Sequence, residues 1–219
     1  MTIEQLLPMM GQGILETLYM TVVSTICAYL IGLPLGVALV YWAPGGLSPK
    51  PKLHSILNTI VNIMRSVPFL ILMMVVMPLS RFIVGTTIGS TAVIVPLVIS
   101  AAPYVGRMVE SSLLEVDVGV LEMAQSIGAS HWQIIRRVYL GEALPSLING
   151  GTISMTTIFG YSAMAAMIGG GGLGAIAVTY GYYRYQYDIL LISTVLMVIF
   201  IQIIQWMGTF ISKRVDKRR

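Results

Sequence analysis

The chain has 219 residues, of which 56% are hydrophobic and only 10% are charged, and its mean hydropathy is +0.85. Soluble globular domains carry about 25% charged residues, so this composition excludes a protein that folds mainly in water. Lys and Arg outnumber Asp and Glu by 13 to 9, but they do not form a dense basic patch. These cations therefore indicate the ends of membrane spans and not a nucleic-acid-binding surface. We therefore expect an all-α integral membrane protein in contact with lipid.

Five apolar stretches are long enough to cross a bilayer as helices, since about 20 helical residues span the hydrocarbon core. They form a single transmembrane domain over residues 1–219 and cover residues 17–41, 56–79, 88–105, 145–167 and 189–211. The first and the last contain no Asp, Glu, Lys or Arg. An odd number of spans places the two termini on opposite sides of the membrane.

The first stretch carries two glycines, Gly32 and Gly36, at the spacing of a small-xxx-small pair. Such a pair lets two helices approach closely in a membrane, so we expect a packing contact there. The single cysteine, Cys27, lies in the same stretch, which rules out a disulfide framework within the chain and favours a buried small apolar residue over a reactive thiol.

The second stretch contains a cation, Arg65, which is followed by Ser66, Val67 and Pro68. A cation inside a membrane span is costly unless it is paired, hydrated or able to reach the interface. Two interpretations stay open. Arg65 either anchors the point where an interfacial helix over residues 56–64 turns into the membrane, or it contacts the pore or a partner.

The longest segment outside the spans, residues 107–144, has the pattern of structured helices. Asp117 is placed to cap a short helix over residues 118–127, in which apolar residues recur at helical spacing. Gly128 then favours a left-handed end to that helix. The first half of the segment therefore predicts a helix that stops at a glycine.

A second short helix is predicted immediately after this glycine. Ser130 and Gln133 have the spacing of a capping box, in which each satisfies a backbone amide of the other, and the helix continues through Tyr139. The segment as a whole predicts a helix, a glycine elbow and another helix. We call residues 117–139 the elbow. Its form is not explained by the need to cross the bilayer.

The basic tail sets the orientation of the spans, because cytoplasmic segments carry an excess of Lys and Arg. Its cations are Lys213, Arg214, Lys217, Arg218 and Arg219. A cytoplasmic tail also places the 42–55 and 106–144 loops inside, with Lys50, Lys52, Arg107, Arg136 and Arg137. Only Arg81 and Arg184 then lie outside. We expect an external N-terminus and a cytoplasmic C-terminus.

The elbow resembles the EAA loop that defines permease subunits of bacterial ATP-binding cassette importers. The matching residues are Glu122, Met123, Ala124, Gly128, Val138, Tyr139 and Leu140. The resemblance implies the type I importer permease fold, whose loop docks into an ATPase subunit and transmits ATP-driven closure to the spans. It assigns ATPase coupling to Glu122, Met123, Ala124, Gly128, Ala129 and Ser130. The chain departs from the pattern at Met123, in place of an alanine, and at Gly141, in place of the usual proline.

Other blocks are similar to the methionine-uptake permeases of that superfamily. These blocks are residues 16–18, 65–69, 103–110, 160–164 and 168–174. The similarity implies uptake of D- or L-methionine across the cytoplasmic membrane of a bacterium. It also implies a homodimer of permeases with two ATPase subunits and a substrate-binding lipoprotein. Because the binding protein largely decides the substrate, a permease for another amino acid or small solute stays an alternative.

The same resemblance implies a group of pore residues in the fourth span. These are Gly160, Ser162, Ala163 and Met164, which would face the axis of the dimer. Met164 would act as the gate, since a flexible thioether can close a pore and then move aside. With 15 methionines in the chain, plain packing is the other interpretation.

Residues 169–174 contain the pattern G-x-G-x-x-G, but they follow a membrane span and not a strand, which argues against nucleotide binding. These glycines are instead expected to form a flexible external lip under the binding protein. The tyrosines that follow are expected there too, either in that lip or in an interfacial belt. They are Tyr180, Tyr182, Tyr183, Tyr185 and Tyr187.

The sequence disfavours two other classes of membrane protein, an enzyme and a secondary transporter or channel. A membrane enzyme is disfavoured because His54 and His131 are the only histidines and have no carboxylate clustered nearby in sequence, so no catalytic residue, metal or cofactor is expected. A secondary transporter or channel would usually need several charged residues within its spans for ion coupling, or inverted repeats; Arg65 alone is not enough, and no repeat is found. The chain also lacks the P-loop pattern, so ATP hydrolysis would require a partner subunit.

Overall fold

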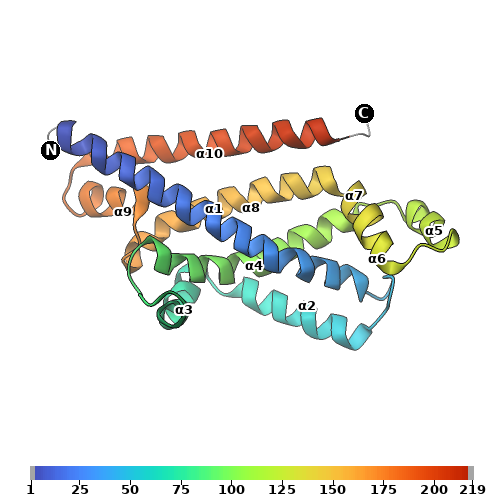
Figure 1. The fold of residues 1–219 in the computed structure, drawn as a ribbon. Coiled ribbons are helices and arrows are strands. Elements are labelled where there is room, and N and C mark those ends of the chain that lie inside the picture. The colour runs from blue at the N-terminus through green and yellow to red at the C-terminus, as the bar shows by residue number, and fades with distance from the viewer. Residues whose placement is uncertain (1–2, 217–219) are drawn as a thin grey trace. The chain divides into compact units, whose positions relative to one another are not determined.

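The structure is a computed structural model that describes residues 3–216, all of whose regular elements are helices (Figure 1). Lys217, Arg218 and Arg219 of the predicted tail lie outside the described residues. The α-helices are α1 (Ile3–Tyr41), α2 (Pro51–Ser66), α3 (Phe69–Val84), α4 (Ser90–Leu114), α5 (Val118–Ser126), α6 (His131–Gln133), α7 (Leu140–Glu142), α8 (Leu144–Met164), α9 (Gly172–Ile176) and α10 (Tyr187–Val215). Two π-helices, η1 (Ile134–Tyr139) and η3 (Ala177–Tyr182), and a 3₁₀-helix, η2 (Ala165–Ile168), complete the order.

Four helical segments of the described range are long and apolar enough to cross a membrane. They are Glu4–Tyr41, Ser90–Leu114, Leu144–Ile168 and Tyr187–Val215. The pair α2 and α3 adds a fifth if it counts as one span. Helices satisfy all their backbone hydrogen bonds internally, which is why apolar segments in lipid adopt them.

The predicted stretch 56–79 is divided into two helices. α2 ends at Ser66 and α3 begins at Phe69, with Pro68 as its N-cap. Proline has no amide hydrogen and disfavours helical geometry in the residue before it, so the break falls there. Arg65 is exposed and lies in the last turn of α2. It therefore belongs to the end of a separate helix and does not lie within a continuous span.

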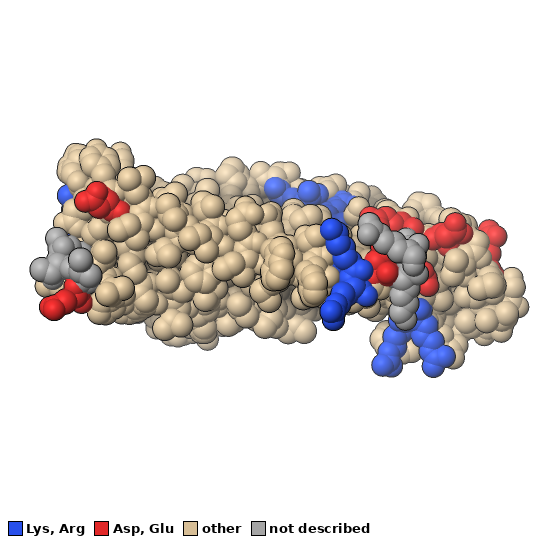
Figure 2. All heavy atoms as spheres, turned by 90° about the horizontal axis from the view of Figure 1, so that it is seen from above, with Lys and Arg blue, Asp and Glu red and all other residues tan. Residues whose placement is uncertain are grey.

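Much of the surface is apolar, as expected for a protein solvated by lipid. Only 11% of the most apolar stretch of α10 is buried, whereas the corresponding stretch of α4 is 61% buried. On the face drawn in Figure 2, the atoms of charged residues are gathered in groups and a broad stretch of surface carries none. α10 thus presents most of its apolar side chains outward.

The chain forms two compact units, which we describe separately. The first unit contains residues 3–27, 67–101 and 155–205. In it, α9 is tied to α1 by backbone amides: Gly172 N–H donates to the Glu16 carboxylate at 2.7 Å, and Leu173 N–H donates to the Thr17 hydroxyl at 2.8 Å. Gly172 has a φ of 88°, which favours glycine. The glycine run that was expected to form a flexible lip is thus partly buried against α1.

The second unit contains residues 28–66, 102–154 and 206–216. In it, α1 packs closely on α4 through its glycine pair. A Cβ added at Gly36 would lie 2.6 Å from the Cβ of Val109, and one at Gly32 would lie 2.7 Å from the Cβ of Val105. No ordinary side chain fits at such separations. The packing interpretation of this pair is therefore confirmed.

Candidate coupling site

The first helix of the elbow is built as its sequence predicts. Asp117 caps α5, because its carboxylate accepts a hydrogen bond from Gly119 N–H at 2.7 Å. At the other end, Gly128 has a φ of 78° and its N–H donates to the Gln125 carbonyl at 2.9 Å. Residues with a side chain adopt this left-handed conformation only with strain, whereas glycine adopts it freely and so makes the bend possible. The predicted cap and glycine stop are both confirmed.

The second helix of the elbow starts with the predicted capping box. Ser130 N–H donates to Gln133 Oε1 at 2.8 Å, and Gln133 N–H donates to Ser130 Oγ at 3.4 Å. After Gln133 the helix widens into the π-helix η1. The wider turn places Ile134 and Tyr139, five residues apart, on the same buried side. Burial also raises the pKa of the Tyr139 phenol above its ordinary value, because a buried phenolate would lose its hydration.

The two helices of the elbow pack together, with α5 against η1. Figure 1 shows both helices at one end of the second unit, and several of their apolar side chains are exposed. Met123, Ile127 and Trp132 are 62%, 79% and 68% exposed, whereas Ala124 is buried beneath them. Large apolar side chains exposed together commonly mark a contact with another protein. A pocket lies alongside and is lined by Ala124, Ile127, Gly128, Ala129, Gln133, Arg137 and Val138. The predicted coupling residues Glu122, Met123, Ala124, Gly128, Ala129 and Ser130 are therefore gathered in one compact projection, with Glu122 and Ser130 exposed.

One tertiary contact of the elbow has no counterpart in the sequence analysis. Tyr41, the last residue of α1, shares a hydrogen bond of 3.0 Å with His131 Nδ1, and the two rings meet edge to face with centroids 5.7 Å apart. The residues are 90 positions apart in the chain. No spacing rule relates them, although both lie at a helix end. The start of the second elbow helix is thus attached to α1.

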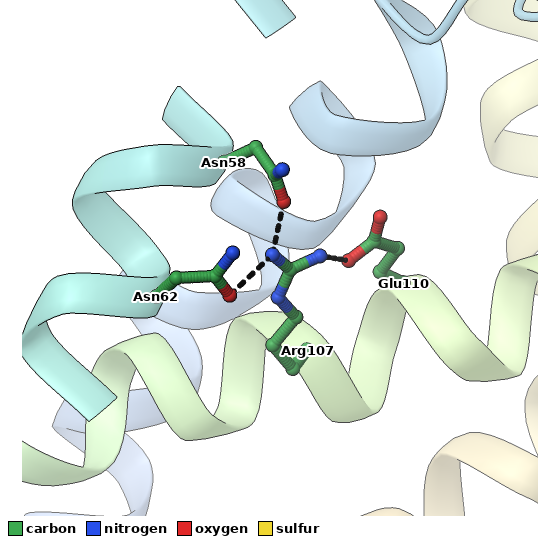
Figure 3. A network of polar contacts seen from close by, with 4 residues as sticks. All are labelled: Asn58, Asn62, Arg107 and Glu110. Carbon is green, nitrogen blue, oxygen red and sulfur yellow. Dashed lines mark hydrogen bonds and ion pairs between the residues drawn. The ribbon is translucent and has the colours of Figure 1, made fainter. Parts of the chain in front are cut away.

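A second such contact joins α2 to α4 (Figure 3). The Arg107 guanidinium on α4 donates to Asn58 and Asn62 on α2 and forms an ion pair with Glu110. The sequence does hold a local signal, since the two asparagines are four residues apart and Arg107 and Glu110 are three apart. Each pair shares one face of a helix, but nothing local indicates that these faces meet.

The four predicted pore residues do not share one face of α8 in the first unit. Gly160 and Met164 are exposed, and Met164 is 48% exposed. Ser162 is buried and its hydroxyl donates to the Phe159 carbonyl at 2.7 Å, while Ala163 packs against Gly174. Of the four, Gly160 and Met164 are therefore exposed, Ala163 is partly exposed and Ser162 is buried.

Removal of the capping box should loosen the second elbow helix without unfolding the protein. We expect Ser130→Ala to destabilise residues 131–139 by about 1 kcal/mol, because a helix amide loses its partner. Faster amide hydrogen exchange over 131–139 would report it. Ser126→Ala is the matched control, since the Ser126 hydroxyl donates only to the Glu122 carbonyl within α5. Equal exchange in both variants would contradict the assignment of the cap.

Several long apolar helices that expose much of their surface indicate a multi-pass membrane protein. A more specific identification comes from residues 30–217, which match the family described as the binding-protein-dependent transport system inner membrane component. The match covers most of the chain, and the chain belongs to this family. It is therefore a permease subunit with several membrane-spanning helices in an inner membrane.

Two curated relatives match nearly the whole chain. The probable D-methionine transport system permease protein MetI of Haemophilus influenzae is 45% identical over 203 residues, which are 93% of this chain and 95% of that protein. The protein of the same name from Vibrio cholerae is 48% identical over 93% of this chain and 90% of that protein. The similarity thus extends over the spans and the elbow alike.

Solved structures show the same fold. A chain of the MetNI methionine ABC transporter in inward-facing conformations has a TM-score of 0.96 and 44% identity, covering 99% of this chain and 100% of that chain. A chain of an amino acid ABC transporter solved with histidines has a TM-score of 0.78 at 19% identity and supports the fold alone. The predicted type I importer permease fold is confirmed.

Proposed function

We propose that this chain is the membrane-spanning permease subunit of an ATP-binding cassette importer that carries D- or L-methionine across the cytoplasmic membrane of a bacterium. The observation that carries the proposal is near-full-length similarity, at 45% and 48% identity, to permeases named for D-methionine transport. The MetNI chain, whose name also specifies methionine, supports it at 44% identity. At such identity over the whole length, the membrane passage is expected to keep its substrate class.

The energy for transport comes from a partner in this proposal. The chain has no P-loop pattern, so as a transport subunit it relies on ATP hydrolysis by a separate ATPase subunit. The working assembly has two copies of this chain, two ATPase subunits and a substrate-binding lipoprotein. No cofactor or metal is required in the permease.

We assign contact with the ATPase to the elbow. Its two helices are each capped, at Asp117 and Ser130, so the projection can be pushed as a rigid body. The exposed side chains of Met123 and Trp132 supply apolar contact area. The residues assigned to coupling are Glu122, Met123, Ala124, Gly128, Ala129 and Ser130.

The proposed orientation places the elbow and the C-terminus in the cytoplasm and the N-terminus outside. Arg136 and Arg137 are exposed on the elbow, and Lys213 and Arg214 are exposed in the last turn of α10. This distribution agrees with the excess of cations in cytoplasmic segments.

A cysteine introduced at exposed Ser126, in a Cys27→Ala background, should react with impermeant thiol reagents only from the cytoplasmic side.

We assign the gate to Met164. Its exposed thioether would close the pore in the resting transporter, so Met164→Ala should allow leak of solute without ATP. Efflux of labelled methionine from loaded proteoliposomes measures that leak. Met74→Ala is the control, since Met74 on α3 is equally exposed at 48%. Tight vesicles with the Met164 variant would refute the gate.

The proposed function is tested by uptake of labelled methionine into proteoliposomes that hold this chain, its ATPase and the binding protein. We expect uptake that requires ATP and is outcompeted by unlabelled methionine. Preferential uptake of another amino acid would show that methionine is not the substrate. Equal flux without ATP would replace the importer by a channel or a secondary carrier.

A further inference from the structure

Arg107 lies at the centre of a polar network in the second unit (Figure 3). One terminal nitrogen, Nη1, donates to Glu110 Oε2 at 2.6 Å, and the other, Nη2, donates to Asn62 Oδ1 at 2.8 Å and to Asn58 Oδ1. The side chains of Arg107 and Glu110 are only 21% and 14% exposed. A cation so placed needs a neutralising charge, which Glu110 supplies. Both terminal nitrogens of Arg107 are paired, whereas its Nε is buried without a hydrogen-bond partner.

The geometry of the network requires a guanidinium. The planar fork of arginine directs one nitrogen along α4 to Glu110 and the other across to α2, where two successive turns each present an asparagine oxygen. A lysine ammonium is a single point and could satisfy only one direction well. The network is therefore a specific attachment of α2 to α4.

Apolar packing contributes little to the attachment of α2. Val61 is the one buried residue of this helix, all of whose residues are described. Leu57 is only partly buried, and most of the other large aliphatic side chains of α2 are exposed. These exposed residues are Leu53, Ile56, Ile60 and Ile63. α2 thus turns its polar face toward α4. The hydrogen bonds of Arg107 hold α2 against α4, a role that buried aliphatic side chains usually have.

The helix that carries Arg107 leads directly into the elbow. α4 ends at Leu114, Val116 is buried, and Asp117 caps α5. Displacement of α5 must therefore be transmitted to the end of α4 through a connection of very few residues. Whether α2 follows depends on what joins it to α4, and that joint is the Arg107 network.

We propose that Arg107 is a positioning residue for transport, which makes α2 move together with α4 when the ATPase displaces the elbow. This inference rests on the proposed function of the chain as an ATP-driven permease. The hydrogen bonds of Arg107 join two helices of this chain. Arg107 acts through Asn58 and Asn62, so its loss should separate ATP hydrolysis from transport and leave the fold in place.

The test uses the complete complex of permease, ATPase and binding protein in proteoliposomes, with uptake and ATP hydrolysis measured together. Arg107→Met should lower the solute moved per ATP by about tenfold, within the usual range of coupling between sites, while ATP hydrolysis continues. Arg107→Lys should retain part of the coupling, with a ratio of solute moved per ATP between those of the parent and of Arg107→Met. Lys52→Met is the control for loss of a cation, because Lys52 is an exposed cation in the first turn of α2.

A distance measurement separates attachment from folding. Spin labels at exposed Ser55 on α2 and Ser111 on α4, in a Cys27→Ala background, should give a narrow distance distribution that stays narrow with and without ATP. Arg107→Met should broaden it. The quadruple variant Arg107→Met, Glu110→Leu, Asn58→Leu, Asn62→Leu should narrow the distribution again and restore uptake, because an apolar contact replaces the whole network and no unpaired carboxylate is left behind.

The outcomes distinguish the two proposals. An unmodified complex that shows no ATP-dependent uptake would overturn the proposed function. An active unmodified complex, together with an Arg107→Met variant of unchanged coupling and a narrow distribution, would overturn the role of Arg107. Both Arg107→Met and Arg107→Lys could also lose ATP hydrolysis and no longer form a monodisperse complex. That result would contradict the positioning role, because it would show that Arg107 has a purely structural role.

Discussion

Gly128→Pro is expected to abolish ATP-driven uptake while the complex still assembles in the membrane. Proline fixes φ near −65°, whereas Gly128 has a φ of 78°, so the bend between the two elbow helices cannot form. The substitution also removes the N–H that donates to the Gln125 carbonyl at 2.9 Å. The local cost is about 3 kcal/mol or more, enough to displace the elbow from its docked form. Uptake and ATP hydrolysis in proteoliposomes measure the effect.

Gly85→Pro provides a closely matched control. Gly85 also has a φ of 78°, its N–H donates to the Arg81 carbonyl at 3.1 Å, and open space surrounds both glycines. The two substitutions therefore impose the same backbone strain in different places. Uptake should persist in Gly85→Pro at the same protein level. Equal loss in both variants would show that the effect is strain in general and would remove the elbow from the mechanism.

Gly36→Leu is expected to destabilise the packing of α1 on α4. Its side chain would have to occupy the space held by Val109 and the Gly106 carbonyl, each 2.6 Å from the added Cβ. Both belong to the packed face of α4, which cannot withdraw as the end of a flexible side chain can. Overpacking of this kind costs about 1–3 kcal/mol, and a rigid helix contact favours the upper end. Thermal unfolding in detergent, followed by tryptophan fluorescence, measures the loss.

Gly11→Leu tests whether the contact, and not leucine itself, is responsible. Gly11 lies in the same helix, is exposed, and has no atom within 4 Å of an added Cβ. Because leucine favours the helix more than glycine does, this variant should be as stable as the parent or slightly more stable. A Gly36→Leu protein with an unchanged unfolding temperature would mean that α1 and α4 separate at no cost.

The parts of this protein that follow from neighbouring residues could be predicted from the sequence. Asp117 and Ser130 satisfy amides within three residues of themselves, and Gly128 supplies a bend through its own φ. Long apolar runs become helices because lipid offers no partner for the backbone. The family resemblance, the membrane helices and the form of the elbow therefore needed only local information.

The tertiary structure alone decided which faces meet. Asn58 and Arg107 are 49 positions apart, Tyr41 and His131 are 90 apart, and no pattern along the chain relates them. Likewise, Ser162 is buried and Met164 is exposed, although both were expected to face the pore. In water, apolar residues mark the inner face of a helix, but in lipid both faces are apolar and this signal disappears. Which side of each helix packs inward was therefore set by close contacts, such as Gly36 against Val109, that form only when the chain is folded.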